Sequence, residues 1–265
     1  MYTMGVDIGS ASSKAVILKD GKEVVATEIV QVGTGTTGPK KVMDQIFTNS
    51  GLTRDDMEYV VVTGYGRFSF EGADKQVSEI SAHAKGIYFL VPTARTIIDI
   101  GGQDAKAIRL DNKGGIKQFF MNDKCAAGTG RFLEVMSRIL ETTLDEMEIH
   151  DESATDTAPI SSTCTVFAES EVISQLSNGV SRNNIIKGVH LSVASRACGL
   201  AYRGGVENDV VMTGGVAQNQ GVVRAVEYTL KTPVTVAPNP QSTGALGAAL
   251  FAFEATQKKE KEGLK

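Results

Sequence analysis

The stretch YTMGVDIG, from Tyr2 to Gly9, decides the fold, because TIIDIGG repeats its ending from Thr96 to Gly102. Each stretch has the pattern of an apolar strand that ends in Asp-Ile-Gly, and two further predicted strands follow it. A chance match of the tripeptide is plausible, but a match of tripeptide, strand order and turn positions together is much less so. Internal repeats of this kind define an architecture, so we interpret the chain as a duplicated α/β fold.

The first copy begins as a three-strand meander. Its predicted elements, in chain order, are strands over 2–8, 12–18 and 23–30, a helix over 39–50, a strand over 58–66 and a helix over 74–90. Asp20-Gly21 is a strong two-residue hairpin signal between the second and third strands. Pro39 and Gly51 are typical of a helix start and a helix end.

The second copy begins after Pro92 and carries the longer tail of helices. Its predicted elements are strands over 96–102, 104–111 and 115–123, a helix after Cys125, a loose polar segment over 148–159, a helix after Cys164, a helix over 184–202, a strand over 209–215, a helix over 219–230, a strand over 233–238 and a final helix from 243. The apolar positions of the helix after Cys125, and of the helix over 184–202, repeat at helical spacing.

Composition and charge exclude several classes of function. The 265 residues carry a net charge of -4 without a block of Lys or Arg, which argues against nucleic acid as a partner. No apolar run is long enough to span a membrane, and the N-terminus lacks the pattern of a signal peptide. Three cysteines far apart in the sequence do not resemble a disulfide framework. We therefore expect a cytoplasmic protein without a membrane contact.

Four glycine-bearing turns fall at predicted strand ends and offer a site for polyphosphate. In the first of them, Asp7 offers a carboxylate for a hydrated Mg²⁺. The amides and hydroxyls of Ser10, Ser12 and Ser13 offer donors to phosphate oxygens, and Lys14 adds a positive charge. One such turn alone is weak evidence, because Asp-x-Gly is a common end to a strand. Neither a Walker A sequence nor a GxGxxG fingerprint occurs.

The ordered set of turns resembles the acetate and sugar kinase, Hsp70 and actin superfamily of ATPases. Its two phosphate motifs match VDIGSASSK (6–14) and IDIGGQDAK (98–106), and its adenosine motif matches VVMTGGVAQN (210–219). GTGRFLEVM (128–136) and TGALGAALF (243–251) look like its two connecting segments. The resemblance implies an α/β, duplicated ribonuclease H-like fold with a nucleotide cleft between the two halves. The implied domains are 1–92 with about 245–265, and 93–244.

This resemblance and the turn chemistry together define candidate residues for ATP/ADP and Mg²⁺. The candidate catalytic residues are Asp7, Gln103 and Asp104. The candidate nucleotide-binding residues are Gly9, Ser10, Ala11, Ser12, Ser13, Lys14, Gly101, Gly102, Gln103, Gly128, Thr129, Gly130, Gly214, Gly215, Gln218 and Asn219. For Asp104, orienting water or magnesium and simple turn-capping are equally good interpretations.

Two cysteines accompany these motifs, each at a predicted strand-to-helix corner. A thiol near free backbone N–H groups and the positive end of a helix dipole favours the thiolate, which binds metals, although a small buried hydrophobe is the plainer interpretation of a lone Cys125. Cys125 and Cys164 cannot complete a four-ligand site alone, but a two-fold homodimer would supply four thiolates. Spacing alone leaves iron–sulfur and zinc both open.

The sequences around these cysteines narrow the choice by resemblance. NDKCAAGTGRFLE (122–134) and ISSTCTVFAESEVISQL (160–176) resemble the ATP-dependent activator components of 2-hydroxyacyl-CoA dehydratases. The family's cysteines imply that Cys125 and Cys164 of two subunits hold one [4Fe–4S] cluster across a homodimer. The resemblance further implies a flavodoxin or ferredoxin as electron donor. A dehydratase component is the implied acceptor, with ATP hydrolysis driving the transfer.

Other interpretations remain open on the residues themselves. An ATPase subunit of a benzoyl-CoA-type reductase, a small-molecule kinase and a non-catalytic ATP-regulated module with structural zinc are the alternatives. The remaining polar candidates are expected to be structural: His83, His150 and His190 as core or surface residues, Cys198 as a core residue, Glu169 and Glu171 as first-turn helix acids, and Arg67 as a surface residue that alternatively faces the dehydratase.

Overall fold

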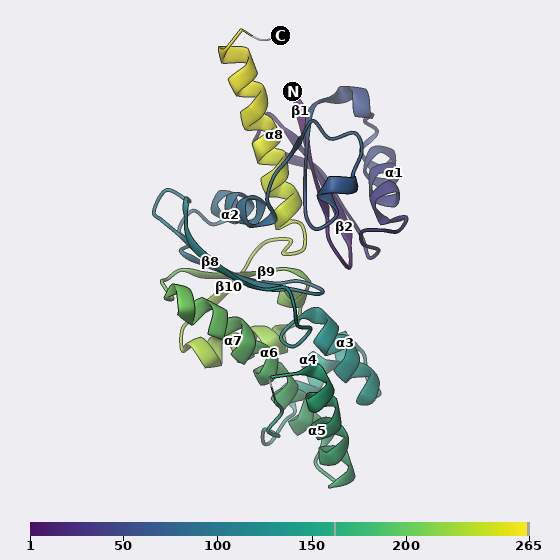
Figure 1. Cartoon of the computed structure of the whole chain (residues 1–265), viewed down its shortest axis with the longest axis vertical. Coiled ribbons are helices and arrows are strands. Elements are labelled where there is room, and N and C mark those ends of the chain that lie inside the picture. Colours follow the sequence, from purple (N-terminus) through teal and green to yellow (C-terminus); the bar gives the residue numbers. More distant parts are fainter. Residues whose placement is uncertain (162, 264–265) are drawn as a thin grey trace. The chain divides into compact units, whose positions relative to one another are not determined.

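The computed structural model describes residues 1–161 and 163–263, which form two compact α/β units (Figure 1). The first unit contains 1–92 with 241–265, and the second contains 93–240. The sequence placed the domain boundaries after residue 92 and near residue 245, and this assignment of domains stays a prediction. Each unit is built around one five-stranded sheet.

The first sheet combines the predicted meander with two parallel strands. Its strands are β1 (Tyr2–Ile8), β2 (Ser13–Lys19), β3 (Glu23–Val30), β4 (Met57–Thr63) and β5 (Lys75–Gln76), in the order β3-β2-β1-β4-β5. Its helices are α1 (Gly38–Ser50), α2 (Glu79–Leu90) and α8 (Thr243–Lys261), with 3₁₀ turns at Arg54–Asp56 and Arg67–Ser69. β2 runs antiparallel to β1, whereas β4 runs parallel to it.

Alternation along β2 places helices on both faces of the first sheet. Ala15 and Ile17 pack into a core with α1, while Val16 and Leu18 pack against α8. In Figure 1, α1 and α8 accordingly lie on opposite sides of these strands. The contact with α8 is close because Gly5 of β1 has no Cβ, which would lie 2.0 Å from the Ala245 carbonyl oxygen. β1 is therefore buried on both faces, which fits its continuous apolar sequence.

The second sheet has the same connectivity. Its strands are β6 (Thr96–Ile100), β7 (Ala105–Leu110), β8 (Ile116–Asn122), β9 (Val210–Thr213) and β10 (Val234–Val236), in the order β10-β9-β6-β7-β8. β7 is antiparallel to β6 and to β8, and β9 is parallel to β6 and to β10. Read from the meander edge, both sheets therefore show the strand order 3-2-1-4-5 of a ribonuclease H-like fold. The predicted fold class is confirmed.

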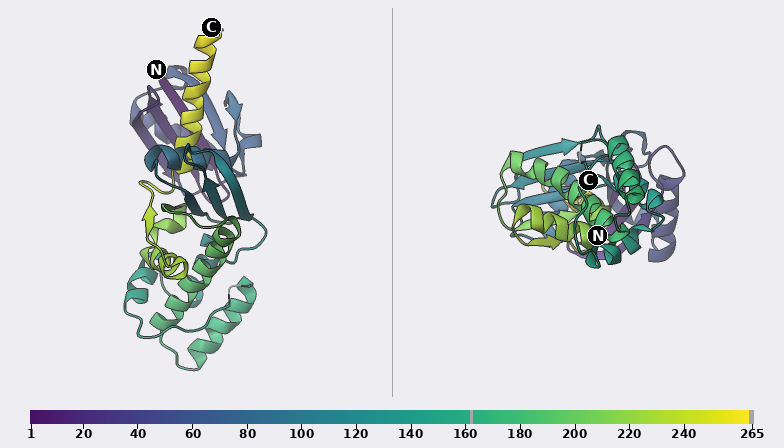
Figure 2. Two further views of the ribbon diagram at one scale, coloured as in Figure 1. Left: turned by 90° about the vertical axis from the view of Figure 1, so that its left-hand side faces the viewer. Right: turned by 90° about the horizontal axis from the view of Figure 1, so that it is seen from below.

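Two helices, α6 (Arg182–Gly204) and α7 (Gln220–Leu230), pack against the second sheet. The helices α3 (Gly130–Ile139), α4 (Leu144–Glu152) and α5 (Thr165–Ser177) pack mainly on other helices of this unit, and a 3₁₀ turn lies at Gly215–Gln218. Figure 2 shows α6 and α7 running beneath the strands of this unit. Ile98, Ile100 and Met212 of the sheet join Val189 and Val193 of α6 in one buried core. Within the described residues, no helix is long and apolar enough to cross a membrane.

Three element predictions were wrong in part. The helix expected from Asp74 begins at Glu79, because Lys75–Gln76 pairs with β4 and the Ser78 hydroxyl accepts the Ser81 N–H at the helix start. Residues 148–152, expected to be loose, complete α4, whose first turn is held by a Thr143–Glu146 capping box. No strand precedes Cys164 in the described residues, and Ser162 lies outside them.

Candidate functional site

The first phosphate turn follows Asp7, which ends β1 and pairs in register with Lys14 of β2. Because the two residues are cross-strand neighbours, the Lys14 Nζ lies 3.2 Å from Asp7 Oδ2. The Asp7 carboxylate is buried, whereas the Lys14 side chain keeps 14% of its surface exposed. The Lys14 ammonium, predicted to contact phosphate, therefore lies beside the Asp7 carboxylate, which is predicted to be catalytic.

The backbone of the first turn is closed by its own hydrogen bonds. The Gly9 N–H donates to the Ser12 carbonyl at 3.0 Å, and the Ser13 hydroxyl donates to the Val32 carbonyl at 2.9 Å. Ser13 is fully buried and Ser12 nearly so, while Ser10 is half-buried and Ala11 is exposed. Of the three predicted hydroxyls, that of Ser13 is thus engaged inside the protein.

The second carboxylate oxygen of Asp7 is unusual. Oδ1 is buried and has no hydrogen-bond partner within the described residues. Gly64, at φ +90°, follows β4 and leaves the space for this oxygen, since a Cβ there would lie 2.4 Å from it. A buried, unpaired carboxylate oxygen is costly unless a water or a cation joins it, so its surroundings fit a hydrated Mg²⁺.

His83 also lies near Asp7, on the other element that borders Gly244, and sequence reasoning did not anticipate this. Its Nδ1 lies 3.1 Å from the Thr243 hydroxyl, and its Nε2 lies 3.7 Å from Glu79. A Cβ on Gly244 would lie 3.1 Å both from His83 Nε2 and from Asp7 Oδ2. The glycine at the start of α8 therefore lets the buried imidazole and the carboxylate converge.

The second phosphate turn repeats the first but adds a carboxylate. Asp99 of β6 pairs in register with Lys106 of β7, and the Lys106 Nζ lies 3.0 Å from Asp99 Oδ2. The same ammonium lies 2.9 Å from Asp104 Oδ1. The Lys106 side chain is only 1% exposed. A buried ammonium of this kind requires paired charges, and here two carboxylates share it.

The start of α3 holds the second turn from outside. The Gly130 N–H donates to the Gly101 carbonyl at 2.9 Å, and the Arg131 N–H donates to the Gly102 carbonyl at 2.8 Å. Within the turn, the Gly101 N–H donates to the Asp104 carbonyl at 2.9 Å. The amides of Gly130 and Arg131 come before the first intrahelical bonds of α3. The carbonyls of the turn therefore accept from donors that a helix start leaves free.

The Gly214-Gly215 turn lies against the second phosphate turn. Gly214, at φ +88°, follows β9 as Gly64 follows β4, and a Cβ on it would lie 2.3 Å from the Ile100 carbonyl oxygen and 2.7 Å from Asp99 Oδ1. Asn219 caps α7 by accepting the Val222 N–H at 3.0 Å. Its side chain also donates to the Leu144 carbonyl at 3.1 Å, whereas the predicted Gln218 is exposed.

Cys125 lies in a loop that leads from β8 into α3. The Asn122 amide donates to the Cys125 carbonyl at 3.0 Å and to the Ala127 carbonyl at 3.1 Å, and the Thr129 hydroxyl donates to the Ala126 carbonyl at 2.7 Å. The thiol is half-buried, five residues before the helix start. The predicted Gly128 is at φ +82°, and a Cβ on it would lie 2.5 Å from the Arg196 Cβ.

Cys164 is the N-cap residue of α5 and is half-buried. Glu171 braces the segment before it, because its carboxylate accepts the Ser161 N–H at 2.5 Å. The sequence predicted Glu169 and Glu171 as first-turn acids, and this was wrong, because α5 begins at Thr165 and has no acidic residue in its first turn. In the residues that the structure covers, no group of three or more Cys, His, Asp or Glu ligands includes either thiol.

The third cysteine and two histidines have internal partners. Cys198 is fully buried in α6, and burial raises the pKa of its thiol to about 12, so it stays protonated. His150 Nδ1 lies 2.8 Å from the Asn183 side-chain oxygen. The buried His190 Nδ1 lies 3.3 Å from Asp151 Oδ1, in an ion-pair position.

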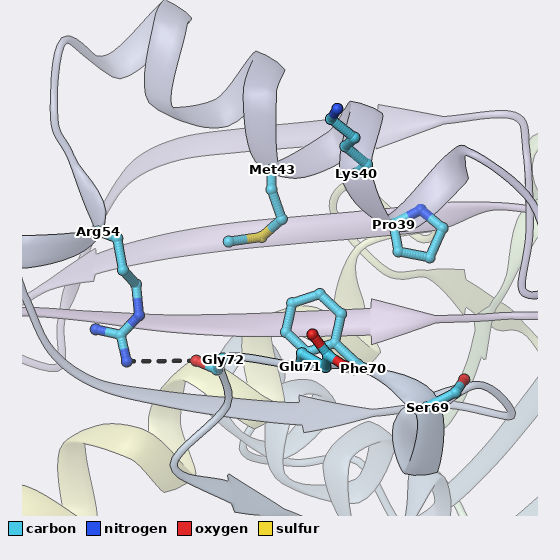
Figure 3. A pocket seen from close by; sticks show the side chains of 8 residues that line it. All are labelled: Pro39, Lys40, Met43, Arg54, Ser69, Phe70, Glu71 and Gly72. Carbon is cyan, nitrogen blue, oxygen red and sulfur yellow. Dashed lines mark hydrogen bonds between the residues drawn. The ribbon is translucent and has the colours of Figure 1, made fainter.

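A surface pocket of about 400 Å³ on the first unit lies outside these motifs. Figure 3 shows its lining residues, which include Met43 of α1 and Phe70 of the loop between β4 and β5. Arg54 donates to the Gly72 carbonyl at 3.3 Å and pairs with Asp74 at 3.2 Å. Arg54 of the lining is thus engaged in internal bonds, and none of the lining residues was a predicted site residue.

Sequence reasoning missed Lys106 although the signal was present. Asp7 and Lys14 are seven residues apart, and so are Asp99 and Lys106, in motifs already recognised as copies. Gly64 and Gly214 carried a similar signal, because each follows Thr at the end of a parallel strand. His83 carried none, since its approach to Asp7 depends on how α2 and α8 pack.

Comparison with known proteins assigns this geometry to a class. Residues 4–252 match the model of the BadF/BadG/BcrA/BcrD ATPase family, and the chain belongs to this family. It is therefore a member of a family of ATPases, as the duplicated phosphate turns predict.

Individual relatives agree closely along the whole chain. The activator of lactoyl-CoA dehydratase from Anaerotignum propionicum is 81% identical over 259 residues, covering 98% of this chain and all of the relative. The structure of the activator of the 2-hydroxyisocaproyl-CoA dehydratase from Clostridium difficile with bound ADPNP has a TM-score of 0.95 at 54% identity, covering 99% of this chain and 98% of the other. The Acidaminococcus fermentans (R)-2-hydroxyglutaryl-CoA dehydratase component A has a TM-score of 0.93 at 54% identity, covering 97% and 99%. The family predicted from the cysteine motifs is confirmed.

Proposed function

We propose that the protein is an ATP-hydrolysing activator that delivers a low-potential electron to a 2-hydroxyacyl-CoA dehydratase component. The observation that carries this proposal is the 81% identity, over the whole relative, to a protein named as the activator of lactoyl-CoA dehydratase. The duplicated Asp–Lys turns support the ATPase part independently of any relative.

The two phosphate turns and the Gly214-Gly215 turn bind ATP in this proposal. Lys14, at the mouth of the first turn, contacts phosphate oxygens, and Asp7 holds hydrated Mg²⁺ through the oxygen that lacks a protein partner. Gln103 and Asp104 orient a water at the γ-phosphate. The water oxygen bonds to phosphorus, the bond to the β-phosphate oxygen breaks, and ADP, phosphate and a proton leave.

Cys125 and Cys164 of two subunits hold one [4Fe–4S] cluster in this proposal. The residues fit the group, because two half-buried thiols per chain meet the four-thiolate requirement only in a homodimer. Cys164 occupies the N-cap position of α5, and the positive helix end there favours an anionic group. When bound, the cluster supplies one-electron chemistry.

A homodimer is further supported by the apolar surface around Cys164. Val166 and Phe167, in the first turn of α5, are 66% and 64% exposed, and Ile173 further along is 49% exposed. Large exposed apolar residues beside a ligand that needs partners from a second chain are typical of an interface. We assign this face of α5 to contact between two copies of the chain.

Coupling between hydrolysis and electron transfer uses a short path in the second unit. The Cys125 loop enters α3 at Gly130, whose N–H donates to the second phosphate turn. A change in that turn on hydrolysis therefore changes the start of α3 and the thiol loop before it. We further propose a flavodoxin or ferredoxin as electron donor, and the cytoplasm as the compartment.

Metal analysis of protein purified without oxygen tests the proposal. We expect a brown dimer with about four iron and four sulfide, because two cysteines per chain complete one cubane. ATP hydrolysis should be measurable in the same sample. Activation of a 2-hydroxyacyl-CoA dehydratase component should require ATP and a one-electron reductant.

Two results would contradict the proposal in different ways. A colourless anaerobic preparation with stoichiometric zinc would exclude the electron-transfer part but leave the ATPase intact. A brown protein that hydrolyses no ATP, alone or with the dehydratase component, would exclude the activator mechanism.

A further inference from the structure

The two phosphate turns are copies in backbone but differ in charge. In both, the glycine after Asp-Ile donates its N–H to a carbonyl three residues on, from Gly9 to Ser12 and from Gly101 to Asp104. Asp104 thus occupies the place of Ser12. The first turn pairs one carboxylate with one ammonium, whereas the second pairs two carboxylates with one.

The two lysines differ as much as the turns do. Lys14 keeps 14% of its side chain exposed and is accessible to a phosphate group. Lys106 is 1% exposed and lies within 3.0 Å of two carboxylates. Burial and charge sharing therefore prevent Lys106 from serving as a second Lys14, although it stands at the equivalent position.

The position of the Asp104 carboxylate indicates the role of Lys106, its ion-pair partner. Asp104 Oδ1 folds over Gly101, where a Cβ would lie 2.6 Å from that oxygen. The Asp104 side chain is 25% exposed, so it reaches from the buried ammonium to the surface of the turn. An ion pair of 2.9 Å to a fixed, buried partner restricts the carboxylate to this orientation.

We propose that Lys106 is a positioning residue for ATP hydrolysis, which holds the Asp104 carboxylate over the second phosphate turn so that it orients the attacking water. Asp99 shares the ammonium and neutralises it together with Asp104, which anchors the lysine on β7. Orientation of a catalytic group by a buried partner raises the rate of the chemical step more than substrate affinity. The inference rests on the ATPase activity proposed above.

A cycle of four proteins tests whether Lys106 acts through Asp104: wild type, Asp104→Ser, Lys106→Met and the double variant. Serine is the residue of the first turn at this place, so Asp104→Ser keeps a backbone that the chain already forms. We expect each single variant to lower kcat at least tenfold, with KM for ATP changed less than about threefold. We expect the double variant to equal Asp104→Ser, because the Asp104 carboxylate that the lysine positions is then absent.

The matched control is Lys14→Met, which should raise KM for ATP more than it lowers kcat. Thermal unfolding confirms that each protein is folded. If Lys106→Met fails to fold and the other variants fold, the test is the comparison of the double variant with Asp104→Ser. Equal kcat values for these two proteins support the proposal.

A further loss of kcat in the double variant would overturn the proposal, and so would a KM effect without a kcat effect in Lys106→Met. If neither Lys106→Met nor the double variant folds, Lys106 is a purely structural residue, and this result also overturns the proposal. A wild type without ATPase activity would instead contradict the proposed function, so the two failures are distinguishable.

Discussion

At the scale of single residues, the three cysteines of this chain have three different environments. Cys125 lies in a hydrogen-bonded loop, Cys164 occupies the N-cap position of a helix, and Cys198 is buried in α6, where burial raises its pKa to about 12. The first two thiols are half-buried, whereas the third is fully buried, and Cys125 and Cys164 stay the proposed ligands.

Cys125→Ser is expected to abolish cluster assembly and leave nucleotide binding largely intact. A hydroxyl is a poor substitute for a cluster thiolate, while the second phosphate turn keeps its bonds to Gly130 and Arg131. Iron content after anaerobic reconstitution and ADPNP binding measure the two effects separately. Cys198→Ser is the matched control and should keep its iron, and a Cys125→Ser protein with full iron would refute the ligand assignment.

At the scale of elements, one charged cluster joins α4, α6 and α7. Asp151 of α4 lies 3.3 Å from His190 of α6 and 2.9 Å from Arg224 of α7. Burial alone would raise the pKa of Asp151, but His190 and Arg224 lower it more, so the net pKa lies below 3.8. The cluster therefore couples helix packing to the charge of one carboxylate.

The stability supplied by Asp151 is expected to depend on pH. Since its folded pKa is lowered, the contribution is fully present above pH 3.8 and is lost as the pH falls through the folded value. Asp151→Asn should cost about 2 kcal/mol at pH 7, and thermal unfolding from pH 7 to pH 3 should show the difference from wild type narrowing at the acid end.

Glu152→Gln is the matched control for this pair. Glu152 contacts the same Arg224 at 2.9 Å but is 61% exposed, so solvent screening should keep its effect within about 0.5 kcal/mol. A difference between Asp151→Asn and wild type that stays constant down to pH 3 would contradict the assigned role.

Elements were predictable where the signal was local, and missed where it was not. The Thr143–Glu146 capping box at the start of α4 is a pattern that the sequence itself contains. Met147 and Asp151 are the buried residues of that helix, so its sequence has no apolar stripe at helical spacing to predict it. β5 is two residues long and exists through its pairing with Val61 and Val62, which no local pattern encodes.

At the scale of the whole chain, the duplication was readable because its repeats carry the same residues at the same spacing. Asp7–Lys14 and Asp99–Lys106 pair across equivalent strands, and Gly64 and Gly214 close equivalent strand ends. The convergence of His83 on Asp7 and the bracing of Cys164 by Glu171 depend on packing between distant segments. Those contacts lay beyond sequence patterns, which report periodicity and spacing only.

The bonds from the start of α3 to the second phosphate turn also make an internal reporter. Gly130 and Arg131 donate their amide protons to the turn and not to an earlier helical residue, so these protons exchange with solvent when the turn opens. We expect deuterium uptake at the two amides to slow when ADPNP binds, as followed by NMR or mass spectrometry. Unchanged uptake would show that the turn does not respond to nucleotide. This measurement needs no metal. Protein without a cluster would therefore report nucleotide binding at Gly130, five residues after Cys125 in the sequence.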